Sequence, residues 1–226
     1  MATIENVNSP TNSQGLVEPQ SKTADYIQEF IFTRTGPLRI NMKICPKSDQ
    51  NHPLYYANIT GSFGDDTDLA LHAGSDRDQP HVGTCHFNKF HAPQIEVHRQ
   101  GGPKSKMIMI KGQGYHWSMP WVHYSTEQGH TEIERHFYWR AQEKHTPASP
   151  GSGKLCLELC STDYDDIYAT YSGAAPGTRK GGILYLKKNL GEEWKTMVIL
   201  TLSTLVEKAR QTRARDGGFT TGMLAY

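Results

Sequence analysis

Long apolar runs are missing from this 226-residue chain, and so is an excess of charge of either sign. The most apolar stretch extends from Trp194 to Val206 and already contains lysine, threonine and serine. A helix that spans a membrane needs about 20 mostly apolar residues. The 24 lysines and arginines are balanced by 23 aspartates and glutamates. These absences argue against an integral membrane protein and against a general nucleic-acid-binding protein.

Cysteine is scarce, and no secretory signal is visible. The four cysteines, Cys45, Cys85, Cys156 and Cys160, are scattered along the chain. This is typical of a protein in a reduced compartment that has no disulfide framework. The N-terminal stretch is polar, rich in Asn, Ser, Pro, Thr and Gln, and has no apolar core. We therefore expect a cytoplasmic protein with a disordered tail over residues 1–24 and a C-terminal tail over residues 217–226.

Motifs of enzymes and metal sites are also missing. The stretch Pro150–Lys154 suggests a phosphate-binding loop, but Ala148 replaces its first glycine and Leu155 replaces its Ser/Thr. The eleven histidines lack the tight spacing of a zinc site, and the acidic groups at 65–68 and 163–166 lack the Gly and Glu of a calcium loop. We expect no catalytic residue, metal or cofactor. An enzyme whose site is assembled across strands remains an alternative.

The strongest pattern present is an apolar helix over residues 192–215. Trp194, Met197, Val198, Leu202, Leu205, Val206 and Ala209 recur at helical spacing, and Ile199 and Leu200 add apolar residues on other faces. Glutamates in the first turn and basic residues in the last two turns suit the helix dipole. Because this helix is apolar almost all round, it must be surrounded by other parts of the protein.

Short segments with strand patterns occupy the chain before this helix. They are Tyr26–Thr33, Leu38–Ile44, Leu54–Thr60, Thr67–His72, His81–Phe87, Gln94–Arg99, Lys106–Lys111, Tyr115–His123, Ile133–Gln142, Leu155–Cys160, Ile167–Ser172 and Gly182–Lys188. Closing such strands into a barrel removes exposed edges, and the helix then fills a bore too wide for side chains alone. The sequence predicts a mainly β domain over residues 25–216: a closed barrel of about twelve strands around a buried hydrophobic C-terminal helix.

Three stretches resemble parts of a known family. Arg135–Trp139 has the sequence RHFYW, Gly181–Leu186 has GGILYL, and Thr196–Arg213 has TMVILTLSTLVEKARQTR. They resemble an aromatic strand, the penultimate element and the helix of the fungal tubby C-terminal-like domain family. Tubby proteins, phospholipid scramblases and plant LURP-one-related proteins share this fold. The resemblance covers roughly Asp25 to Asp216 and implies twelve strands around a hydrophobic C-terminal helix.

Two functions found in these relatives are treated differently here: the first is not implied, and the second transfers no binding residue to this chain. Scramblases carry an acidic calcium-binding segment shortly before the helix, whereas residues 173–180 of this chain are basic. Calcium-dependent scrambling is therefore not implied. Tubby domains bind phosphoinositides through basic strand residues, but none of those residues can be matched one by one to this chain.

Basic loops are the remaining candidates for function. Between Gly173 and Arg215 nine basic residues stand against three acidic ones, a local charge of +6. The lipid-binding candidates are Arg179, Lys180, Lys187, Lys188, Arg99, Lys104 and Lys106. Each cation near an anionic membrane contributes about 1 kcal/mol of binding, although the commonest role of such residues is solvation.

The sequence thus predicts a monomeric, non-enzymatic binding module that associates reversibly and peripherally with anionic phospholipid head groups. A protein-interaction scaffold that binds no lipid is an alternative, alongside the enzyme mentioned above.

Overall fold

The computed structural model describes residues 26–36, 40–60, 67–87, 94–101, 104–110, 113–125, 129–142, 154–163, 166–174 and 180–215. These residues form twelve antiparallel strands and one helix, α1 (Glu192–Arg215). The strands are β1 (Gln28–Thr35), β2 (Asn41–Pro46), β3 (Tyr55–Thr60), β4 (Thr67–Ala73), β5 (His81–Phe87), β6 (Gln94–Arg99), β7 (Lys104–Ile110), β8 (Gly114–Ser125), β9 (Gly129–Ala141), β10 (Cys156–Ser161), β11 (Ile167–Gly173) and β12 (Lys180–Leu186). The predicted mainly β fold is confirmed.

The strands follow one another around a closed barrel in the order of the sequence. β1 pairs with both β2 and β12, and these two pairings close the ring. Inward and outward residues alternate in strands such as β3, where Tyr55, Ala57 and Ile59 are buried and the residues between them are partly exposed. This alternation places an apolar lining on the inside of the barrel.

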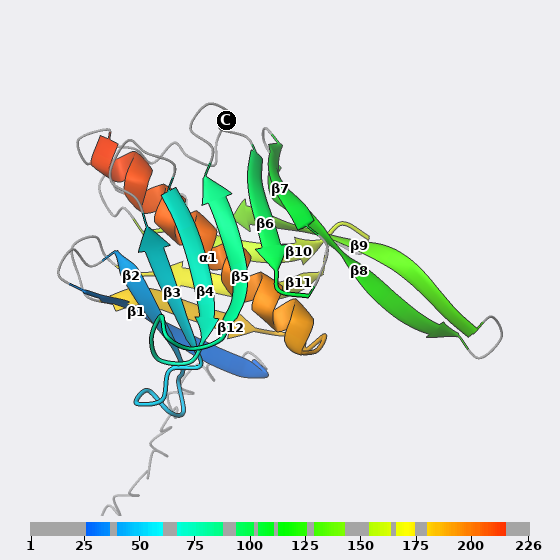
Figure 1. Cartoon of the computed structure of the whole chain (residues 1–226). Coiled ribbons are helices and arrows are strands. Elements are labelled where there is room, and N and C mark those ends of the chain that lie inside the picture. Colours follow the sequence, from blue (N-terminus) through cyan, green and yellow to red (C-terminus); the bar gives the residue numbers. More distant parts are fainter. Residues whose placement is uncertain are drawn as a thin grey trace, which may run out of the picture.

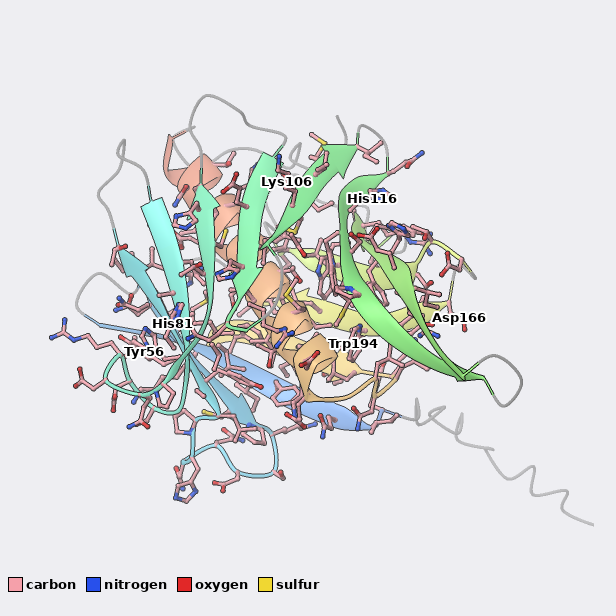
Figure 2. The ribbon with its side chains drawn as sticks, turned by 45° about the vertical axis from the view of Figure 1, so that its right-hand side comes forward. Tyr56, His81, Lys106, His116, Asp166 and Trp194 are labelled. Carbon is pink, nitrogen blue, oxygen red and sulfur yellow. The ribbon has the colours of Figure 1, made fainter. Side chains whose placement is uncertain are left out.

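Helix α1 occupies the bore of the barrel (Figure 1). Every residue from Trp194 to Glu207 is buried except Thr196. This burial confirms the prediction that other parts of the protein surround the helix. Figure 2 shows Trp194 on the first turn of α1, inside the ring of strands. A buried hydrogen bond links the barrel wall to the helix: the indole N–H of Trp139 donates to the hydroxyl of Thr201 at 3.0 Å.

The two ends of the barrel are distinguished by the direction of α1. We call the end at which α1 begins the proximal end and the opposite end the distal end. The strand register places Leu186, the last residue of β12, beside Gln28 at the proximal end. It places Lys180, the first residue of β12, beside Thr33 toward the distal end.

The hairpin of β8 and β9 extends beyond the wall of the barrel (Figure 1). Its strands pair with each other from Tyr115–Trp139 to Ser125–Gly129. The pairing of β8 with β7 covers only Ile108–His116 to Ile110–Gly114. The far part of the hairpin therefore forms an arm.

Predicted strand bounds agree with the structure for β5 and β6 and shift by a few residues elsewhere. β2 begins at Asn41, β7 begins at Lys104, and β12 ends at Leu186, so that Lys187 and Lys188 follow the strand. The predicted tails over residues 1–24 and 217–226 lie outside the described residues.

Candidate functional site

The structure distributes the predicted lipid-binding residues between the two ends of the barrel. Lys187 and Lys188 follow β12 at the proximal end, and Arg99, the last residue of β6, lies at the same end. Lys104 begins β7 opposite His98 and so also lies toward the proximal end. Lys180 begins β12 toward the distal end, and Arg179 lies outside the described residues. The predicted set therefore does not form one surface.

Lys106 lies on the outer side of β7 and is exposed. The strand register sets it directly across from Glu96 of β6, which is also exposed. Figure 2 shows Lys106 well separated from Asp166, which lies near the proximal end. An opposite charge on the neighbouring strand reduces the positive potential at Lys106, so this residue is a weak candidate for holding an anion.

Several of the proximal cations have partners within the protein. Arg99 lies 3.3 Å from a carboxylate oxygen of Glu193 on the first turn of α1. The ammonium of Lys188 lies 3.7 Å from Asp166, and that of Lys187 lies 6.0 Å from the centre of the Tyr26 ring. Exposed ion pairs stabilise a protein by about 0–1 kcal/mol, so Lys188 can exchange its carboxylate for another anion at little cost.

A cavity of about 480 Å³ opens at the proximal end, between the starts of β1 and α1. Its volume lies within the range of about 300–1,000 Å³ typical of small-molecule sites. The lining residues are Tyr26, Ile27, Gln28, Glu29, Phe30, Pro46, Lys47, Ser48, Leu54 and Lys195. Five of these residues are apolar and five are polar or charged, so the wall is more polar than the mostly apolar lining of a typical small-molecule site.

The charged residues of the cavity are arranged in pairs. The ammonium of Lys47 donates to Glu29 at 2.6 Å, and this hydrogen bond, together with the charge of Glu29, raises the pKa of Lys47. The ammonium of Lys195 donates to Glu192 at 2.6 Å, and Lys195 is buried although Glu192 is exposed. A lysine of this kind keeps its apolar stem against the core and its charge at the mouth of the cavity.

Two exposed apolar side chains border the cavity. Ile27 is 56% exposed and Leu54 is 43% exposed. Ile108 and Ile110 of β7, at 38% and 40%, are comparably exposed on the outer wall and do not line the cavity. The proximal end therefore presents apolar tips next to lysines.

The distal end contains a buried charged cluster at the last turns of α1. Glu207 is fully buried and accepts hydrogen bonds of 2.6–3.0 Å from Arg210 and one of 3.1 Å from Gln211. Arg34 of β1 lies 3.7 Å from the same carboxylate. Because the carboxylate is satisfied by these neighbours, the cluster fastens α1 to the barrel rather than forming a ligand site.

Burial also changes the acidity of two residues near this cluster. The ammonium of Lys208 lies 5.1 Å from the centre of the Tyr115 ring, and burial lowers the pKa of Lys208. Burial raises the pKa of Tyr115 to about 12. Both shifts follow from the low dielectric constant of the bore.

Histidine, cysteine and carboxylate side chains are the ligands from which a metal site would be built. Among the residues that the structure describes, no three His, Cys, Asp or Glu side chains lie close enough together to hold an ion. The four cysteines are free thiols, and Cys45, Cys85 and Cys160 are buried. Residues 65, 66, 150–153, 164 and 165 lie outside the described residues, whereas Asp163 and Asp166 are described and exposed.

Sequence reasoning missed the residues of the cavity. It treated Lys195 only as a polar interruption of the helix, and it assigned Ile27 and Leu54 to strands without noticing their exposure. The signal available was weak: two large aliphatic residues at the very start of predicted strands, where the chain enters a barrel from a loop.

No protein-family model and no curated protein matches this chain. Within the described residues, no helix is both long enough and apolar enough to cross a membrane.

Proposed function

We propose that this chain is a non-enzymatic binding module that associates reversibly with membranes containing anionic phospholipid. The observation that carries the proposal is the position of exposed Ile27 and Leu54 at the mouth of a cavity that also presents Lys47. Lys187 lies beside Tyr26 on the same rim. Apolar tips that enter the interface next to cations that meet the head groups are the usual combination of peripheral membrane proteins.

The energetic terms of this proposal favour weak, reversible binding. Burying an aliphatic side chain contributes about 1.5–3 kcal/mol when burial is complete. Ile27 and Leu54 are only partly exposed before binding, so each contributes less than this full value. Each lysine near an anionic surface adds about 1 kcal/mol. The total binding free energy is smaller than that of a membrane-spanning helix, and its electrostatic part decreases as salt is added.

Two further parts of the proposal follow the same reasoning. We propose that the chain is a member of the tubby C-terminal-like fold family, supported by the twelve-stranded barrel around a C-terminal helix. We also propose a cytoplasmic location, supported by the scarcity of cysteine.

Sedimentation with vesicles tests the membrane proposal. Wild-type protein should bind vesicles of phosphatidylcholine with phosphatidylglycerol more strongly than vesicles of phosphatidylcholine alone. Binding should weaken between about 0.1 M and about 1 M salt, because the Debye length falls from about 10 Å to about 3 Å. Equal binding to the two vesicles at low salt would contradict the proposal.

Matched variants identify the surface involved. Ile27→Ser with Leu54→Ser should reduce vesicle binding, whereas Ile108→Ser with Ile110→Ser, of similar exposure, should not. A second pair of variants compares the cations at the two ends. Lys187→Glu with Lys188→Glu reverses charge at the proximal end, and Arg179→Glu with Lys180→Glu reverses two other lipid-binding candidates predicted from the sequence. A loss of binding only in the variant at Arg179 and Lys180 would show that the distal end faces the membrane.

A protein-interaction scaffold is the second candidate, favoured by the arm of β8 and β9. A long hairpin that projects beyond a barrel offers backbone groups at its edges to a partner. Replacing residues 121–132 with a short turn should then abolish capture of a partner while leaving vesicle binding unchanged.

A further inference from the structure

The cavity at the proximal end carries both signs of charge among its lining residues. Lys47 and Lys195 are cations and Glu29 is an anion, so the lining residues sum to +1. A ligand with only negative groups would meet Lys47 but would also lie against Glu29, 2.6 Å from that lysine. Complementarity therefore favours a ligand that carries both signs and a net negative charge.

A lining acceptor that an ammonium can reach is Glu29. Its side chain lines the cavity and is 28% exposed, and it accepts a hydrogen bond from Lys47, whose side chain is 52% exposed. An exposed pair of this kind contributes little to stability, so a ligand ammonium can join or replace Lys47 at little cost. Hydrogen bonds between ionised groups are the stronger ones, so Glu29 favours a ligand that carries an ammonium.

The residues that line the cavity also include hydrogen-bond donors for the acid groups of a ligand. The ammonium of Lys195 has one hydrogen bond, to Glu192, which leaves two of its three N–H groups for other acceptors. The hydroxyl of Ser48 and the ammonium of Lys47 are further donors. Tyr26 and Pro46 supply the apolar part of the wall, against which a short carbon chain can pack.

We propose that this cavity binds a primary ammonium flanked by acid groups, the chemistry shared by free O-phosphoserine and the head group of phosphatidylserine. The vesicle form of this inference rests on the membrane association proposed above, whereas the form with a free ligand does not. The ammonium meets Glu29, and the acid groups meet Lys195 and Lys47.

Calorimetric titration with free compounds tests the chemistry. O-phospho-L-serine should bind, whereas glycerol 3-phosphate, which lacks the ammonium, and ethanolamine, which lacks the acid groups, should bind at least about tenfold more weakly. This factor is that expected for losing one charged hydrogen bond. Equal affinity for O-phospho-L-serine and glycerol 3-phosphate would overturn the inference, as would a failure of O-phospho-L-serine to bind.

Variants then assign the binding to the cavity. Lys195→Met keeps the buried stem and removes the charge, so it should weaken O-phospho-L-serine binding about tenfold. Lys195→Arg should restore most of the affinity, which a purely structural role would not predict. Glu29→Gln should remove the preference over glycerol 3-phosphate. Lys43→Met, on β2 but outside the cavity lining, is the control and should bind as wild type does. Unchanged binding in Lys195→Met would overturn the assignment.

Vesicles separate this inference from the proposed function. Phosphatidylserine and phosphatidylglycerol carry the same net charge, but only the first has an ammonium. Preference for phosphatidylserine vesicles, lost in Glu29→Gln, supports the inference. Equal binding to both vesicles, with no binding of free O-phospho-L-serine, overturns the inference and leaves membrane association intact. Binding of O-phospho-L-serine without any vesicle binding overturns membrane association and leaves the cavity assignment intact.

Discussion

Replacing Glu207 with glutamine should destabilise the protein strongly, although the two side chains have nearly the same shape. The carboxylate of Glu207 is fully buried and is held by Arg210 and Gln211, with Arg34 at 3.7 Å. Glutamine keeps the volume but removes the negative charge. Two arginines then remain at the distal end of the barrel without the carboxylate that they face, so the substitution tests charge and not packing.

The size of the effect can be worked from the exposure of these partners. Removing one member of a buried ion pair costs about 3–5 kcal/mol. The side chains of Arg34 and Arg210 are 14% and 25% exposed, so water can partly solvate them. We therefore expect a loss near the lower limit, about 3 kcal/mol of unfolding free energy. In a domain of this size, each kcal/mol lowers the melting temperature by about 2–4 °C, which gives a total of about 6–12 °C.

Glu193→Gln on the same helix is the matched control. Glu193 also faces an arginine, Arg99 at 3.3 Å, but its side chain is 67% exposed. Exposed pairs are worth at most about 1 kcal/mol, so this variant should melt close to wild type. Thermal unfolding followed by circular dichroism measures both variants. If Glu207→Gln melts at the temperature of Glu193→Gln, the buried cluster does not stabilise the fold and the reasoning is wrong.

Three other substitutions test the packing and the ionisation of the barrel. Leu202→Asp places an unpaired charge in the bore and should prevent folding; a variant that melts at the wild-type temperature would contradict this. Gly83→Ala should cost about 1–3 kcal/mol in urea unfolding, because its Cβ would lie 2.7 Å from Leu200 Cδ2, and Leu200→Val should recover part of the loss. Burial, and secondly the charge of His136, lowers the pKa of His116 from 6.5. Below about pH 6.5 the unfolded chain then binds more protons at His116 than the folded chain does. The protein therefore becomes less stable as the pH falls. His116→Gln should therefore reduce the difference in melting temperature between about pH 7 and about pH 5, and an unchanged difference would contradict the prediction.

The sequence by itself determined the architecture of this protein, because the relevant signals are local. Alternation of apolar residues marks a strand within a few residues, and the spacing of Trp194, Met197 and Leu202 marks a helix within a few turns. The predicted and observed bounds of α1 coincide, and those of β5 and β6 also coincide. The all-round apolar character of α1 then required a surrounding structure, and a closed barrel provides it.

Only the tertiary structure decided which side chains meet. Barrel closure brings Tyr26, Leu54 and Lys195 together around one cavity, although they are far apart in the sequence. Strand direction sends Lys180 and Lys187 toward opposite ends, although they are only seven residues apart in the numbering. Charge on a sequence carries no information about its partners, so Glu207 could not be distinguished from a solvated glutamate. Its burial depends on how far α1 extends through the bore, which the packing of the whole barrel sets.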